Sequence, residues 1–194
     1  MTDPPVFCYD LGSPYAWLAA ERLAAGMLPG VRWEPVLLGG LFRATGRSSW
    51  AQTESRAAGI AEVEARARAR RLPAPRWPRP WPNDGLRAMR AAVAAHAAGR
   101  GEAFALAALR VQFAEGRALS DDAPLTEAAG RVGLDPGALL AATADPEVKA
   151  RLRANTDGAL AAGVVGVPAV LVAGEVFWGD DRLDDAARAA GGAR

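Results

Sequence analysis

The sequence has one cysteine and one histidine among its 194 residues. The single Cys8 excludes an internal disulfide, a C-x-x-C redox pair and a zinc site rich in thiolates, and we expect it to be a small core residue of a strand. The single His96 excludes a metal site built from several imidazoles. Because His96 follows Val93 by three residues and Met89 by seven, we interpret it as packed on the apolar face of a helix rather than as a general base.

The sequence also lacks an excess of charge of either sign and a long apolar run. Its 23 Lys and Arg nearly balance its 22 Asp and Glu, whereas binding to a phosphate backbone requires a basic patch, so we expect no nucleic-acid partner. The longest uncharged stretch, 158–174, contains Gly and Pro and is shorter than the ~20 residues that span a bilayer. The segment M-T-D-P-P has no basic or apolar region typical of a signal peptide. We expect a cytoplasmic protein that does not contact a membrane.

The first elements of the chain alternate between strand and helix. The apolar run in 5–9 predicts a short buried strand, the spacing of the apolar residues in 13–26 predicts a helix, and 31–37 predicts a second strand. A strand, a helix and a strand in this order form a βαβ unit, in which the two strands are parallel. The chain therefore begins with the first half of an α/β domain.

The middle of the chain contains no segment that resembles a strand. Proline and glycine divide it into helices, which we expect at roughly 51–71, 84–98, 101–115, 121–132, 135–142 and 145–162. In the first of these, Glu62 precedes Arg66 by four residues and Glu64 precedes Arg68 by four, which is typical of a solvated helix face.

A proline-rich stretch, R-W-P-R-P-W-P at 76–82, separates the first two of these helices. It should be extended, because proline favours extended backbone. Its residues Trp77 and Trp81 either close over a pocket or pack into the core.

Strand character returns in A-V-L-V-A, residues 169–173. The turn signal Gly174-Glu175 and the V-F-W after it predict a β-hairpin, and a last helix is expected from about Asp181. The order of elements is βαβ, a helical block, then αββα. We therefore predict a discontinuous α/β domain, 1–38 and 145–194, with an inserted helical domain, 39–144.

Three motifs, in this order, resemble those of one family. F-C-Y-D-L-G-S-P-Y-A-W-L-A is similar to the F-x-x-D-x-x-S-P-Y-x-x-L-A of 2-hydroxychromene-2-carboxylate isomerases and the related kappa-class glutathione transferases. G-V-V-G-V-P resembles the family's G-x-x-G-V-P, and F-W-G-D-D-R-L resembles its F-x-G-x-D-R-L. Shorter similarities between them extend the resemblance over nearly the whole chain. It implies an α/β, thioredoxin-like fold with a large all-helical insertion between the βαβ and αββα halves.

Ser13 stands where a helix begins, and two roles are compatible with it. As an N-cap it would accept a hydrogen bond from a free amide of the first turn, with Pro14 preset at N1. In disulfide oxidoreductases of the thioredoxin superfamily the reactive cysteine occupies the place of Ser13 and its partner that of Ala16, so dithiol chemistry is excluded here. The resemblance implies instead that Ser13 is catalytic and holds the sulfur of glutathione as a thiolate at the helix N-terminus.

The other two motifs imply further contacts to glutathione. Val167 would pair through its backbone with the cysteinyl residue, and the bond to Pro168 is expected to be cis, although Pro168 could simply begin a strand. Asp180 and Asp181 would bind the γ-glutamyl group, or only cap the last helix, and Asp181 is the better match to the family's acid. Asn83 would contact glutathione or substrate, or only cap a helix or a turn.

The basic contact to glutathione differs from the family pattern. Related transferases bind the glycine carboxylate of glutathione with a lysine of the insertion's first helix, and this chain has no lysine there. Arg56 is one candidate replacement. We expect no metal site.

The resemblance implies a glutathione-dependent isomerase. The thiolate of bound glutathione would add reversibly to a small aromatic substrate, allow its cis-trans isomerisation, and leave. One alternative is a kappa-class-like glutathione transferase that releases a conjugate. Another is a non-enzymatic thioredoxin-like module that binds peptides along the Val167 edge. Relatives in the family imply a homodimer.

Overall fold

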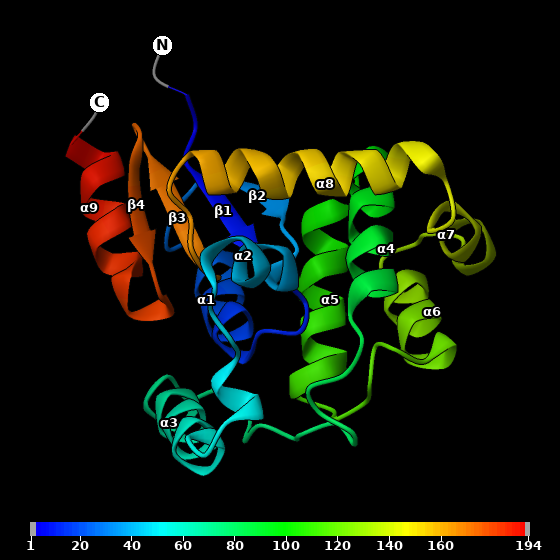
Figure 1. Ribbon diagram of the computed structural model, residues 1–194, viewed down its shortest axis with the longest axis horizontal. Helices are drawn as coiled ribbons and strands as arrows, with labels where there is room; N and C mark the ends of the chain where they lie inside the picture. Colours follow the sequence, from blue (N-terminus) through cyan, green and yellow to red (C-terminus); the bar gives the residue numbers. More distant parts are fainter. Residues whose placement is uncertain (1–2, 193–194) are drawn as a thin grey trace.

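The computed structural model describes residues 3–192, and a four-stranded mixed sheet organises the fold (Figure 1). The strand order is β2-β1-β3-β4. Strand β1 (Val6–Tyr9) is parallel to β2 (Arg32–Pro35), and helix α1 (Pro14–Ala24) connects the two. Strand β3 (Ala169–Val172) is antiparallel to β1 and forms a hairpin with β4 (Glu175–Trp178). The predicted βαβ unit and C-terminal hairpin are confirmed.

Between β2 and β3 the chain is helical, and the described residues 36–168 contain no strand. The helices are α2 (Leu38–Thr45), α3 (Arg56–Ala69), α4 (Leu86–Ala97), α5 (Gly101–Phe113), α6 (Asp122–Arg131), α7 (Pro136–Ala142) and α8 (Pro146–Ala161), with a 3-10 helix η1 (Trp50–Gln52) before α3. Helices α4 to α7 pack together beside the sheet, and α8 runs back from them to the sheet (Figure 1). This arrangement confirms the thioredoxin-like fold with a helical insertion.

Helix α2 was not among the predicted helices, because Gly39 and Gly40 in its first turn disfavour a helix. Side chains from distant segments stabilise its start. The Leu38 N–H donates to Asp10 Oδ2 (2.8 Å), and the Leu37 N–H donates to Thr156 Oγ1 (3.0 Å). These tertiary hydrogen bonds satisfy amides that the local sequence leaves free.

The turn of the hairpin lies one residue earlier than predicted. Strand β3 ends at Val172 and β4 begins at Glu175, so the turn residues are Ala173 and Gly174. Both have positive φ, 49° and 87°, which is the geometry of the two-residue turns that match the twist of a hairpin. After β4, a 3-10 helix η2 (Asp180–Arg182) leads into the last helix α9 (Leu183–Gly192).

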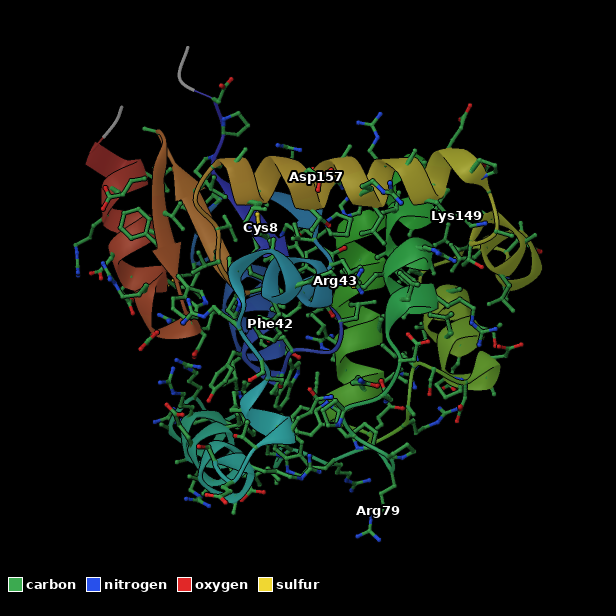
Figure 2. The ribbon with its side chains drawn as sticks, viewed as in Figure 1. Cys8, Phe42, Arg43, Arg79, Lys149 and Asp157 are labelled. Atoms are coloured by element: carbon green, nitrogen blue, oxygen red, sulfur yellow. The ribbon has the colours of Figure 1, made fainter. Side chains whose placement is uncertain are left out.

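Strand β1 places its side chains on both faces of the sheet, because side chains alternate along a strand. Phe7 and Tyr9 pack on one face with Trp33, whereas Cys8 packs on the other beneath α8 (Figure 2). Burial raises the pKa of the Cys8 thiol to about 12, so Cys8 is the inert core residue that the sequence predicts. His96 packs against the first face, with its Nε2 atom 3.1 Å from the Tyr9 hydroxyl, as expected for a packed residue.

No helix within the described residues is long and apolar enough to cross a bilayer.

Candidate functional site

A pocket of ≈ 300 Å³ opens at the N-terminus of α1. This volume is at the lower end of the range of about 300–1,000 Å³ that is typical of ligand sites. Four parts of the chain form its wall: the start of α1, α2 with the loop to η1, α3 with the end of the proline-rich stretch, and the segments flanking the β3–β4 hairpin. The lining residues used below are Ser13, Tyr15, Phe42, Trp50, Glu62, Arg66, Trp81, Gly166, Val167, Pro168, Trp178, Asp180 and Asp181.

Ser13 is the N-cap of α1, which confirms the structural half of its prediction. Its backbone is extended, and its Oγ atom accepts a hydrogen bond from the Ala16 N–H (3.2 Å), while Pro14 occupies the first helical position. The Ser13 hydroxyl donates to the Val167 carbonyl oxygen over 3.4 Å, beyond the usual range for O–H···O hydrogen bonds. Because this bond is long, the proton can turn to a closer acceptor in the pocket.

Two backbone amides beside Ser13 have no acceptor within the described part of the chain, those of Tyr15 and Val167. Tyr15 is in the first turn of α1, where helix amides and the helix dipole favour an anion. The Val167–Pro168 bond is cis, as expected, and the Gly179 N–H donates to the Pro168 carbonyl (2.9 Å). The Val167 segment is thereby joined to the one that carries Asp180 and Asp181.

Asp180 is completely buried, and its two carboxylate oxygens face two arginines at the C-terminal end of α3. Oδ1 pairs with Arg66 and Oδ2 with Arg70, while Arg22 donates to the Asp180 backbone carbonyl (3.1 Å). Its carboxylate is thus engaged by the protein itself. This geometry differs from the expectation that Asp180 contacts a γ-glutamyl group.

Asp181 differs from its neighbour because its side chain is 59% exposed at the edge of the pocket. Its nearest cation is Arg66, whose Nη2 atom lies 3.6 Å from Asp181 Oδ2. The side chain lies back over Gly179, where a Cβ would be 2.3 Å from Asp181 Oδ1 and where φ is 116°. Both facts require glycine at position 179.

Helix α3 faces the pocket with residues that the sequence predicts to be solvated. Arg66 pairs with Glu62 (2.5 Å), as its spacing predicts, but also reaches Asp180. The Tyr15 hydroxyl donates to Glu62 Oε2 (2.8 Å). Burial and, next, this carboxylate raise the pKa of Tyr15, so its phenol is protonated. The i,i+4 spacing of charged residues predicts ion pairs within a helix, but it does not show which other element the helix packs against.

The second pair predicted on α3 does not form. Among the described residues Arg68 has no acidic partner, and Glu64 instead accepts a hydrogen bond from Trp77 Nε1 (3.2 Å). The prediction of a solvated face is therefore wrong for Arg66, which turns to Asp180, and for Glu64, which Trp77 contacts. Arg70, the C-cap of α3, also turns to Asp180.

Five aromatic side chains contribute to the apolar wall of the pocket. They are Tyr15, Phe42, Trp50, Trp81 and Trp178. Phe42 extends from α2, and Arg79, in the proline-rich stretch, points away from the body of the molecule (Figure 2). The two tryptophans of that stretch have different roles: Trp81 lines the pocket, whereas Trp77 packs behind it, with ring centroids 4.7 Å apart.

Asn83 and Arg56, two candidates from the sequence, do not line this pocket. The Asn83 Nδ2 atom is 3.5 Å from the Pro80 carbonyl, and its Oδ1 atom accepts a hydrogen bond from Gln112 (3.4 Å). Arg56 lies with its guanidinium over the ring of Trp81, 5.2 Å from the centroid, and donates to the Ala51 carbonyl. Residues 3–192 contain no group of three or more His, Cys, Asp or Glu side chains arranged to hold a metal ion.

Comparison with solved structures relates this fold to an isomerase and to oxidoreductases. A 2-hydroxychromene-2-carboxylate isomerase matches with a TM-score of 0.84 and 21% identity, over 98% of this chain and 96% of that one. A probable DsbA oxidoreductase from Streptomyces coelicolor matches with a TM-score of 0.72 and 25% identity, over 98% and 91%. A thioredoxin-like oxidoreductase from Silicibacter pomeroyi matches with a TM-score of 0.59 and 22% identity, over 98% and 87%.

A search of the curated proteins found no match. The sequence does match the profile of one family, the DSBA-like thioredoxin domain, over residues 6–191. Because this match extends over nearly all of the chain and agrees with the fold, the protein belongs to the DSBA-like thioredoxin domain family.

Proposed function

We propose that this protein is a glutathione-dependent isomerase of the 2-hydroxychromene-2-carboxylate isomerase type. The observation that carries the proposal is the Ser13 hydroxyl at the N-terminus of α1, in a pocket lined by five aromatic side chains. The single thiol of the chain, Cys8, is buried on the far face of β1 from the core of Phe7 and Tyr9 and does not line the pocket. Sulfur chemistry at Ser13 would therefore use a thiol that the protein binds.

The residues around Ser13 fit the parts of glutathione. The free amides of Tyr15 and Val167 offer donors to a thiolate and to the backbone of a short extended peptide. A γ-glutamyl group carries an ammonium and a carboxylate. Asp181 offers a carboxylate to the ammonium, and Arg66, 3.6 Å away, offers a guanidinium to the carboxylate. In this assignment Asp180 holds Arg66 in place rather than binding glutathione.

When bound, glutathione supplies a thiolate that adds reversibly to an electrophilic carbon of the substrate and leaves after rotation about the former double bond. Glutathione is therefore not consumed. Ser13 turns its hydroxyl from the Val167 carbonyl to the sulfur and stabilises the thiolate by a charge-assisted hydrogen bond. The first-turn amides of α1 act in the same direction. Both effects lower the pKa of the bound thiol, as helix N-termini lower the pKa of cysteine.

The aromatic wall supports a planar aromatic substrate. The ring of Trp50 contacts two other rings of the wall: its centroid lies 5.5 Å from that of Trp81 and 6.1 Å from that of Tyr15. Rings packed in this way are held rigidly and offer edges and faces to another ring. The pocket can therefore bind a flat apolar group next to the sulfur site.

The experiment is a titration with reduced glutathione, followed by turnover of 2-hydroxychromene-2-carboxylate with glutathione and with S-methylglutathione. We expect saturable binding of glutathione, turnover only with the free thiol, and weaker glutathione binding in Asp181→Asn. Asp157→Asn, on the exposed face of α8 (Figure 2), is the control and should bind as the wild type does. Failure of the wild-type protein to bind glutathione would refute the proposal, and release of a glutathione conjugate would favour a transferase.

A further inference from the structure

Arg47, in the loop after α2, does not itself line the pocket but contacts a residue that does. Its guanidinium carbon is 4.6 Å from the ring centroid of Trp178, which lines the pocket. Phe42 and Ser49, on either side of Arg47 in the chain, also line it. Within residues 3–192 Arg47 makes no salt bridge. A cation–π contact occupies the flat face of a guanidinium and leaves the N–H groups at its edge free to donate.

Trp178 is held in place although it is 45% exposed, the one large hydrophobic side chain that the described residues expose. Its indole packs directly on Gly166: a Cβ at position 166 would lie 2.8 Å from Trp178 Nε1 and 3.0 Å from the adjacent ring carbon. Any side chain at Gly166 would displace the indole. The indole of Trp178 therefore lies between Gly166 and the guanidinium of Arg47.

The acidic residues of the pocket wall all pair with arginines other than Arg47. Arg66 pairs with Glu62, and Arg66 and Arg70 pair with Asp180. Asp181 faces Arg66 on the side assigned above to glutathione. The acids of the pocket wall are thus paired with arginines of α3, and no acid of the wall pairs with Arg47.

We propose that Arg47, positioned by Trp178, binds the carboxylate of the second substrate, a planar aromatic acid whose ring occupies the aromatic pocket. A guanidinium edge matches a carboxylate with two parallel hydrogen bonds, and a stacked guanidinium is already oriented for this contact. This inference rests on the proposed function, because it assigns the anionic group of the substrate to a place distinct from the contacts of glutathione. It predicts that the protein distinguishes aromatic acids from their uncharged esters.

Binding of chromone-2-carboxylate and of its methyl ester tests the inference without turnover. Tryptophan fluorescence reports binding, because three tryptophans line the pocket. We expect the wild type to bind the acid at least about tenfold more tightly than the ester, the scale of a hydrogen bond to a charged group. Arg47→Gln should remove this preference, because it should weaken binding of the acid and leave binding of the ester unchanged. Arg153→Gln, an exposed arginine of α8, removes the same charge elsewhere and should keep the preference.

Two further variants separate positioning from charge. Trp178→Leu keeps Arg47 but removes the ring on which its guanidinium stacks. This variant should bind the acid more weakly than the wild type and retain part of the preference for the acid over the ester. Arg47→Lys keeps the charge without the fork-shaped edge and should also bind the acid more weakly than the wild type. If Trp178→Leu and Arg47→Lys both bind the acid as the wild type does, the positioning role is refuted.

Glutathione titrations on the same samples distinguish this inference from the proposed function. Arg47→Gln should bind glutathione within twofold of the wild type. If Arg47→Gln instead loses glutathione affinity and keeps its preference for the acid, Arg47 belongs to the glutathione site and the inference is wrong. A wild type that binds acid and ester equally overturns it as well. A wild type that binds no glutathione yet prefers the acid refutes the proposed function alone.

Discussion

The Asp180→Asn substitution tests whether the ion pairs at the pocket wall hold α3 against the C-terminal segment. Asp180 is completely buried, and its partners Arg66 and Arg70 have side chains 26% and 21% exposed. Asparagine keeps the shape of the residue but removes the charge. Breaking a buried ion pair by removing one partner costs about 3–5 kcal/mol. We expect a loss of about 3 kcal/mol, the lower end, because Arg66 keeps Glu62 and both arginines reach water.

Thermal and urea unfolding at pH 7 measure this loss. For a protein of this size a loss of about 3 kcal/mol corresponds to a Tm lowered by roughly 6–12 °C. Asp185→Asn is the control: Asp185 pairs with Arg182 and Arg188 at an exposed site on α9, and its loss should leave the Tm nearly unchanged. If Asp180→Asn unfolds within the error of the wild type, the pairs contribute no net stability and the anchoring of α3 must be assigned to other contacts.

Three further predictions concern single residues. Burial and, next, Arg32 lower the pKa of His96, so an NMR titration of this single histidine should give a pKa below 6.5. The stability of the wild type should fall as the pH drops through 6.5, because the unfolded chain then binds a proton more readily than the folded one. His96→Gln should lack this loss of stability. Ser13→Ala should cost about 1 kcal/mol in urea unfolding and lower glutathione-dependent turnover by about 10²–10³, and turnover within a few-fold of the wild type would leave Ser13 as a cap only. Gly59→Ala should destabilise by about 1–3 kcal/mol, because its Cβ would lie 2.3 Å from the Trp50 ring, whereas Gly130→Ala, with open space around it, should stabilise α6.

Local patterns were enough to predict the sheet and the cap of α1. Strands β1 and β3 are short runs of apolar residues, and Ser13-Pro14 has the chemistry of a helix start. Helix α2 could not be predicted in the same way. Its glycines oppose a helix, and the groups that stabilise its start, Asp10 and Thr156, come from other segments of the chain.

The candidate site shows the same division. The Ser13, Val167 and Asp181 motifs, which the family resemblance assigns to one ligand, lie on segments that meet at one end of the sheet and line one pocket. The burial of Asp180 could not be predicted, because the arginines that neutralise it precede it by more than a hundred residues on α3. The role of Asn83 stays a prediction that this pocket does not support, since its amide contacts Pro80 and Gln112 instead.

The most direct test of the account is turnover of 2-hydroxychromene-2-carboxylate with a small, known amount of reduced glutathione, with free thiol measured at the start and the end. Reversible addition of a thiolate held by Ser13 predicts that many moles of isomerised product form per mole of glutathione and that the free thiol is fully recovered. The same rate without glutathione, or a loss of one thiol for each product formed, would contradict it.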